Sequence, residues 1–228
     1  RAFDKILARP DSNLLQQTYA ENFRQSIDAA ARYNQSTNAI DTQTPFPATD
    51  VGRSFERILK TIAASSALGH QRQIFFVSHG PWDQHGGLIG PHQETLTEIS
   101  QALGAFQSGL REIGFDEKVI TFTASDFGRT LAGNGKGSDH GWGGNQLVMG
   151  GGIRGHDVYG NYPTSLAAGN PLDVGRGRLI PTLSVDQYAA ELVMWLGINN
   201  DSDLETILPN VRNFYASGSS SKPVGFTL

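Results

Sequence analysis

The chain contains no cysteine among its 228 residues. Disulfide bonds, thiolate metal ligands and cysteine nucleophiles are therefore excluded together. The sequence also lacks a run of about 18 apolar residues, so it predicts no membrane span. Basic residues never cluster, and the net charge of −4 favours no nucleic-acid partner. What remains is a protein of ordinary composition that is long enough to bury a core.

Glycine, in contrast, is abundant and concentrated in one region. Eleven of the 27 glycines lie between Gly133 and Gly160. Glycine allows backbone conformations and close approaches that other residues resist. We therefore expect this region to be an ordered loop system that passes close to a ligand or to another segment.

The spacing of apolar residues predicts the main elements. Apolar residues recur at three- and four-residue steps in four segments, which predicts helices over 11–36, 51–68, 93–113 and 185–196. Short apolar runs predict buried strands over 73–79 and 118–123, and a third strand over 146–150. A helix separates the first two strands, so the order implies parallel neighbours with a right-handed crossover. The sequence thus predicts an α/β fold with a mainly parallel central sheet flanked by helices.

Acidic and imidazole side chains follow two of the predicted strands. The first strand leads into a loop with Asp83 and His85, the second leads to Asp126, and a glycine-rich loop then brings Asp139 and His140. In open α/β sheets, ligands bind beyond the carboxyl ends of the strands. Carboxylates and imidazoles are donors for divalent metal ions. These five residues are therefore the predicted metal ligands.

Two further residues are candidates for catalytic roles. Arg129 follows Asp126 by three residues and is expected either to orient a carboxylate or to bind an anionic substrate. His79 closes the first predicted strand and is expected to be a core histidine or a neighbour of the metal ligands. Simpler interpretations stay open: an Asp126–Arg129 salt bridge and a hydrogen-bonded turn at Asp83. Arg176 and Arg178 follow glycines and are expected either to lie in a solvated loop or to meet an anion.

Several short motifs carry a family resemblance. They are WDQH at 82–85, SDFGRT at 125–130, DHGWGG at 139–144 and YGNYP at 159–163, with RLIPT at 178–182 and WLG at 195–197. In this order, over about residues 50–200, they resemble the hallmark segments of the bacterial domain of unknown function 1501 family. That family is similar to the alkaline phosphatase and sulfatase superfamily. Three positions depart from its pattern: Pro81 and Gln84 replace a Gly and a Thr, and Asp126 replaces a Glu.

The resemblance implies an alkaline-phosphatase-like α/β sandwich with a two-metal site for phosphate or sulfate esters. It implies that the chain corresponds to the C-terminal half of that fold. The N-terminal half, with a further metal carboxylate and a Ser or Thr nucleophile, would then be its partner. The resemblance also implies export, often by the twin-arginine route, to the bacterial periplasm or exterior. We accordingly divide the single domain or half-domain into a helical lead-in (1–50), a family core (51–200) and a tail (201–228).

The leading hypothesis is metal-dependent hydrolysis of a phosphate or sulfate ester. The ion would be zinc, manganese, calcium or magnesium, and the substrate a small anionic ester or a sulfated or phosphorylated glycan. One alternative is a catalytically degenerate envelope or polysaccharide-binding module of the same fold. Another is an Asp/His/Arg hydrogen-bond network that holds no metal.

Overall fold

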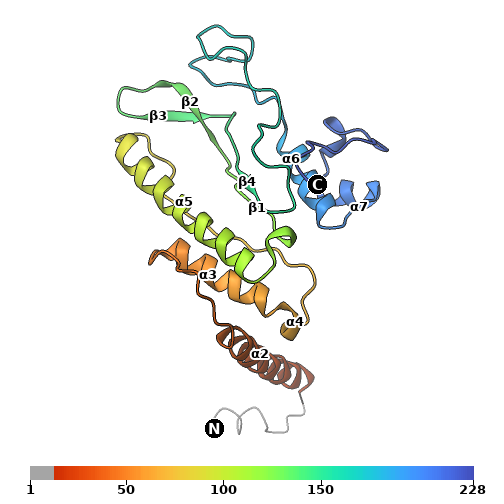
Figure 1. Ribbon diagram of the computed structural model, residues 1–228. Helices are drawn as coiled ribbons and strands as arrows, with labels where there is room; N and C mark the ends of the chain where they lie inside the picture. The colour runs from red at the N-terminus through yellow and green to blue at the C-terminus, as the bar shows by residue number, and fades with distance from the viewer. Residues whose placement is uncertain (1–12) are drawn as a thin grey trace.

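The computed structural model describes residues 13–228 and combines helices with short strands (Figure 1). The helices are α2 Leu14–Asn38, α3 Asp50–Ala63, α4 Ser65–Leu68, α5 Ile89–Glu112, α6 Val185–Trp195 and α7 Asp201–Ile207, with the short 3-10 helices η1 Asp116–Lys118 and η2 Val211–Asn213. The strands are β1 Thr121–Phe122, β2 Gly128–Gly133, β3 Ser138–Gly141 and β4 Val148–Met149. No helix in this part of the chain is long and apolar enough to cross a membrane.

The four predicted helices are present. The first is α2, although residues 11–12 of the prediction lie outside the described residues. The second is divided into α3 and α4 at Ala64. The third, α5, begins earlier than predicted, at Ile89. The fourth, α6, starts with a capping box in which the Ser184 side chain accepts from the backbone amide of Gln187. Such a cap satisfies amides that have no partner within the helix.

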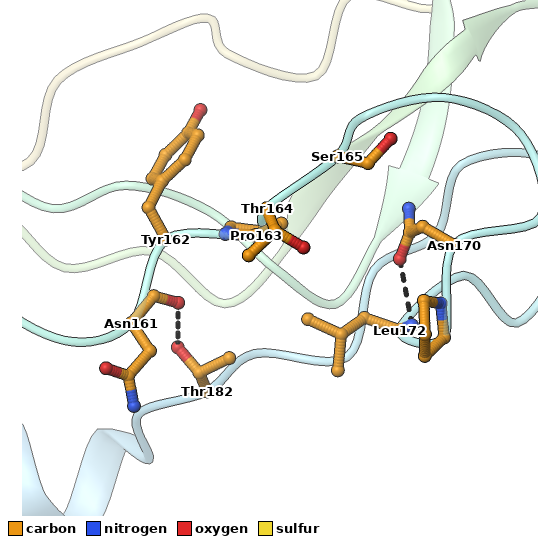
Figure 2. Close-up of a pocket in the computed structure, with 9 residues that line it drawn as sticks. Asn161, Tyr162, Pro163, Thr164, Ser165, Asn170, Leu172 and Thr182 are labelled. Atoms are coloured by element: carbon orange, nitrogen blue, oxygen red, sulfur yellow. Dashed lines mark hydrogen bonds between the residues drawn. The ribbon is translucent and has the colours of Figure 1, made fainter.

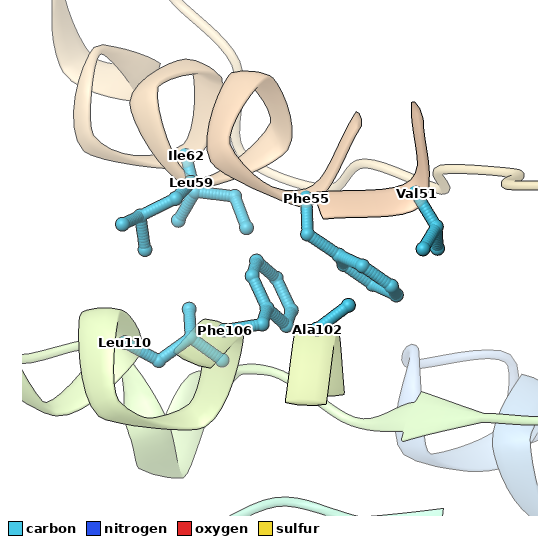
Figure 3. Close-up of a cluster of buried hydrophobic side chains, with 7 residues drawn as sticks. All are labelled: Val51, Phe55, Leu59, Ile62, Ala102, Phe106 and Leu110. Carbon is cyan, nitrogen blue, oxygen red and sulfur yellow. The ribbon is translucent and has the colours of Figure 1, made fainter. Parts of the chain in front are cut away.

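The main core lies between α3 and α5, which pack against each other (Figure 3). Its buried members are Val51, Phe55, Leu59, Ile62, Ala102, Phe106 and Leu110. The rings of Phe55 and Phe106 meet with their centroids 4.9 Å apart. Gly109 permits this close packing, because a Cβ there would lie 2.5 Å from Cδ2 of Leu59. Burial of each large apolar side chain contributes about 1.5–3 kcal/mol to the free energy of unfolding. The α3–α5 pair is therefore stable and supports the loop that precedes α5.

The strands form two small antiparallel sheets. β1 pairs with β4, with Thr121 opposite Met149. β2 pairs with β3 in a hairpin that places Arg129 opposite His140. Residues 13–228 therefore do not form the expected mainly parallel central sheet. The β2–β3 hairpin lies where the sequence predicts only loop, because its glycine-rich strands lack the apolar alternation that marks a half-buried strand.

The predicted strand at 73–79 has no regular secondary structure and pairs with no strand among the described residues. Val77 packs against the α3–α5 core, whereas Ile74 and Phe76 are 79% and 91% exposed. The prediction of a buried strand here is wrong. A parallel strand is buried when both faces of its sheet are covered, and the described helices cover only the side that carries Val77.

A second, smaller core joins α6 to α7 and η2, with Ala190, Leu204, Val211 and Tyr215 as its buried members. Next to Ala190, Glu191 is only 1% exposed. Its carboxylate accepts hydrogen bonds of 2.6–2.9 Å from the backbone amides of Val224, Gly225 and Thr227 and from the Thr227 hydroxyl. This carboxylate therefore fastens the 224–227 segment to α6.

The environment of Glu191 also fixes its charge. Burial alone would raise the pKa of Glu191, but the backbone amides of Thr227, Gly225 and Val224 outweigh burial and bring the pKa below its ordinary value of 4.5. A carboxylate whose pKa is lowered by folding stabilises the fold at pH values above its pKa in the unfolded state. That contribution is lost as the pH falls through the folded-state pKa.

We expect Glu191→Gln to lower the free energy of unfolding by about 1.5–3 kcal/mol at pH 7, because a neutral amide cannot accept from all of these donors. Urea denaturation measures the change. The difference from wild type should shrink as the pH is lowered below 4.5. Glu94→Gln, on the exposed surface of α5, is the matched control. Equal losses in the two variants would contradict the assigned role of Glu191.

Candidate metal centre

The loop of residues 80–88, here called the site loop, lies against the β2–β3 hairpin. The Gly87 amide donates to the carbonyl of Lys136 at 2.8 Å, and the Asn134 side-chain amide donates to the carbonyl of His85 at 3.1 Å. A Cβ at Gly137 would lie 2.8 Å from the His85 backbone. Glycine at this position therefore allows the site loop and the hairpin to approach closely.

Three side chains from these two segments converge on one point. Asp83 and His85 belong to the site loop, and His140 belongs to β3. Asp83 Oδ1 lies 2.6 Å from His140 Nε2 and 3.0 Å from His85 Nε2, and the two Nε2 atoms are 3.2 Å apart. We call these residues the Asp83–His85–His140 triad. About half of each side chain is exposed, so the triad is open to solvent.

The donor atoms of the triad fit a divalent cation. Two imidazole nitrogens and one carboxylate oxygen form a ligand set of catalytic zinc sites, which keep a further position open. Asp83, His85 and His140 would hold such an ion through these three atoms. The two Nε2 atoms share one oxygen of Asp83 and also contact each other. A cation bound by all three atoms would accept a lone pair from each of them.

Asp139 lies beside His85. Its Oδ1 is 3.4 Å from His85 Nδ1. Asn134 donates to Oδ1 and Arg176 donates to Oδ2, each at 2.8 Å. These two hydrogen bonds lower the pKa of Asp139 to about 2, so its carboxylate is charged at neutral pH. A carboxylate that accepts from one ring nitrogen of a histidine aims the other nitrogen at a metal. Asp139, a predicted ligand, therefore has the geometry of a group that orients His85.

Arg129 joins the site loop to the hairpin. Its Nη1 donates to the carbonyl of Ser138 and its Nη2 to the carbonyl of Trp82, both at 2.6 Å. Nη2 also lies 3.4 Å from Asp83 Oδ1. Because both terminal nitrogens are engaged, Arg129 does not present the free two-pronged fork with which arginine binds an anion. Arg129 thus positions the triad.

Phe127 holds the imidazole of His140. The two rings stack with centroids 4.2 Å apart and an angle of 10° between their planes. The guanidinium of Arg129 lies over the same phenyl ring, 5.1 Å from its centroid. The stack fixes the His140 ring while its Nε2 faces Asp83. The hydrogen bond from His140 is the largest cause of the lowered pKa of Asp83.

Two other predicted site residues lie outside the triad. Asp126 is exposed and forms no hydrogen bond or ion pair with any residue of 13–228, so the described structure contains no Asp126–Arg129 salt bridge. His79 Nε2 lies 3.3 Å from the carbonyl of Thr95 in α5, and its ring meets Trp82 edge-on at 5.8 Å. His79 therefore ties the start of the site loop to α5.

Sequence reasoning missed two supporting residues and left a third between two interpretations. Asn134 Oδ1 accepts from the backbone amides of 136 and 137, so Asn134 shapes the hairpin turn while its amide holds Asp139. In the sequence, nothing distinguishes Phe127 from an ordinary apolar residue. Arg176 has a φ of 60°, which few non-glycine residues adopt. Its position between two glycines is the signal that makes it a candidate anion ligand in the sequence.

Together these features define a mixed helix and sheet protein with an exposed two-histidine, one-carboxylate centre on a glycine-rich hairpin. Residues 7–189 match the family described as "Protein of unknown function (DUF1501)". This match covers most of the chain, and the chain belongs to the DUF1501 family, as the motifs predict. No curated protein and no solved structure matches the chain.

Asp83→Asn should weaken zinc binding by at least about 10–100-fold, because it removes the only carboxylate of the triad. Isothermal titration calorimetry on metal-free protein measures the affinity. Asp126→Asn is the matched control, since it makes the same chemical change on an exposed carboxylate outside the triad. A similar loss of affinity in both variants would show that the triad is not the metal centre.

Asp139→Asn should weaken zinc binding by about 10–100-fold without abolishing it, because the neutral amide is a weaker acceptor for His85 Nδ1 than the carboxylate. Nitrogen NMR of the imidazoles reports which ring nitrogen of His85 carries the proton. We expect that proton to lie mainly on Nδ1 in the wild type and to redistribute in the variant. Unchanged affinity together with an unchanged tautomer would exclude this role.

Proposed function

We propose that this protein is a metal-dependent hydrolase of phosphate or sulfate esters. The observation that carries the proposal is the convergence of Asp83 Oδ1, His85 Nε2 and His140 Nε2 within 2.6–3.2 Å of one another on an exposed surface. A bound divalent ion would supply Lewis-acid polarisation of the ester oxygen and activation of a nucleophile. The contribution of the chain is to hold the donors and to attract the anionic substrate.

The composition of the triad favours some of the expected ions over others. Calcium and magnesium take oxygen ligands almost exclusively. Imidazole nitrogens suit zinc, copper, iron and nickel, and carboxylate oxygen suits manganese. With two nitrogens and one oxygen, the triad favours zinc, with manganese next, over calcium and magnesium.

The substrate anion has a suitable partner in Arg176. Its guanidinium donates one hydrogen bond, to Asp139 Oδ2, and forms no other within residues 13–228. The side chain is more than half exposed. Its remaining N–H groups are thus available to bind two oxygens of a phosphate or sulfate group. Because Asp139 also contacts His85, this anion site would adjoin the triad.

On the motif resemblance we also propose that the activity is of the alkaline phosphatase and sulfatase type. An N-terminal half of the same protein would then supply a second metal carboxylate, the nucleophile and the neighbours of a parallel sheet. The exposed Ile74 and Phe76, on a segment with no paired strand among the described residues, support this part of the proposal. The resemblance likewise favours export to the periplasm or exterior of a bacterium.

The second candidate function is a binding module of the same fold without catalytic activity. The position of Asp126 favours it, since this carboxylate replaces a longer one of the family pattern and does not reach the triad. In this case the triad would hold an ion for structural or ligand-binding purposes only.

Full-length protein loaded with zinc or manganese is expected to hydrolyse 4-nitrophenyl phosphate or 4-nitrophenyl sulfate. Asp83→Asn should reduce the rate by at least about 10–100-fold, and Asp126→Asn should leave it near the wild-type rate. Release of 4-nitrophenol gives the rate. Absence of turnover of both esters with either ion would refute the hydrolase proposal and favour the binding module.

A further inference from the structure

The segment of residues 172–180 folds back on itself and carries Arg176 to the metal centre. At its base, the Ile180 amide donates to the carbonyl of Leu172 at 2.9 Å. The Leu172 amide in turn donates to the side chain of Asn170 at 2.8 Å (Figure 2). These hydrogen bonds fix the base of the segment, so the position of Arg176 depends on the turn at its tip.

This turn has a backbone conformation that few sequences adopt. Gly175, Arg176 and Gly177 follow one another with φ values of 108°, 60° and 70°. Glycine takes such values without steric cost, whereas arginine does not. A non-glycine residue in this region persists only where its surroundings fix it, and such residues gather at functional sites. A contact within the turn is therefore needed to hold Arg176 in place.

The Asp173 carboxylate supplies this contact. Its Oδ1 accepts from the backbone amides of Gly175 at 2.8 Å and of Gly177 at 2.9 Å. An aspartate that accepts from the amide two residues further on stabilises a turn, and here the same oxygen also accepts from the amide four residues on. Hydrogen bonds to a charged acceptor are the stronger ones. Asp173 thus fixes the backbone both before and after Arg176.

The same turn is attached to β2. The Leu131 amide donates to the carbonyl of Gly177 at 3.0 Å, and the Ala132 amide donates to the carbonyl of Arg176 at 3.3 Å. A Cβ at Gly177 would lie 2.6 Å from Cβ of Leu131, so glycine is required for this close approach. From this place Arg176 Nη2 donates to Asp139 Oδ2 at 2.8 Å.

Arg178 differs from Arg176 although it also follows a glycine. Its Nε donates to the carbonyl of Gly175 at 3.0 Å, and its Nη2 lies 3.5 Å from the carbonyl of Val174. The guanidinium of Arg178 therefore faces the turn itself, whereas that of Arg176 faces the metal centre. The conformation of the turn decides which of the two arginines reaches Asp139.

We infer that Asp173 is a positioning residue of the metal centre, because it holds the turn that presents Arg176 to Asp139. Asp139 Oδ1 lies 3.4 Å from His85 Nδ1, so a displaced Arg176 would also disturb the partner that orients a triad histidine. Arg176 is the anion ligand of the proposed function as well. The inference deepens that function and rests on it for the roles of the metal and the anion.

Nitrogen NMR of metal-free full-length protein tests the turn directly. A guanidinium held by a carboxylate rotates slowly about its Cζ–Nη bonds, so its nitrogen signals report the contact of Arg176 with Asp139. Asp173→Asn should keep the slow rotation of the wild type, because its amide oxygen can still accept from both backbone amides. Asp173→Ala should make the rotation roughly tenfold faster, since the charge-assisted hydrogen bond is lost.

Asp157→Ala is the matched control for this measurement. Asp157 is exposed, belongs to the same long loop between β4 and α6, and accepts from the backbone amide of Val158. Asp173→Ser, whose shorter side chain cannot reach both amides, repeats the test with a milder change. Slow rotation of the Arg176 guanidinium in Asp173→Ala or in Asp173→Ser would overturn the inference.

Zinc titrations distinguish a positioning role from a general loss of stability. Asp173→Ala should weaken zinc binding by about tenfold, the lower end for groups that support a ligand. Arg176→Gly, a change that the φ of 60° favours, should weaken it similarly. If Asp173 acts through Arg176, both changes together should weaken binding no more than either alone. Additive losses would show that Asp173 does not act through Arg176.

These outcomes separate the inference from the hydrolase proposal. Guanidinium rotation requires neither a metal nor turnover, so a faster rotation in Asp173→Ala supports the role of Asp173 even if aryl esters are not cleaved. Conversely, cleavage of aryl esters by the wild type together with unchanged rotation in Asp173→Ala removes the positioning role and leaves the hydrolase proposal in place. A wild type that binds no zinc would contradict the metal centre, and the rotation measurement alone would then decide the role of Asp173.

Discussion

The guanidinium of Arg129 bridges two carbonyl oxygens from distant parts of the chain, and the metal centre depends on this bridge. One carbonyl belongs to Trp82 in the site loop and the other to Ser138 at the start of β3. Hydrogen bonds from a charged donor are stronger than those between neutral groups. The bridge brings Asp83 to within 2.6 Å of His140. Together with the hydrogen bonds of Gly87 to Lys136 and of Asn134 to His85, the bridge holds the site loop against the hairpin that carries His140.

The other contacts around this bridge support the metal centre in different ways. The α3–α5 core provides the platform, since α5 begins directly after the site loop. Asn134 holds the hairpin turn, the His85 backbone and Asp139 at once. Arg176 reaches Asp139 from the segment of residues 172–180, in which the Ile180 amide donates to the carbonyl of Leu172. The metal centre and the anion site that we propose thus adjoin each other through the Arg176–Asp139 contact.

The helices could be predicted from sequence because their signal is local: apolar spacing and caps such as Ser184 suffice. The sheet could not, because an apolar run such as 73–79 becomes a buried strand only if other segments cover it. The motifs directed attention to Asp83, His85 and His140, which the structure brings close together. The position of Asp139 follows from its contact with Asn134 in the β2–β3 hairpin, which the glycine-rich sequence does not predict. Asp126 lies before β2 and stays exposed.

The central claim is that Asp83, His85 and His140 bind one shared cation. Anomalous diffraction from crystals grown with zinc, recorded on both sides of the zinc absorption edge, tests it directly. The account predicts an anomalous peak about 2.0–2.2 Å from Asp83 Oδ1, His85 Nε2 and His140 Nε2. A zinc-loaded crystal with its peak elsewhere, and with these three side chains still hydrogen bonded only to one another, would contradict it.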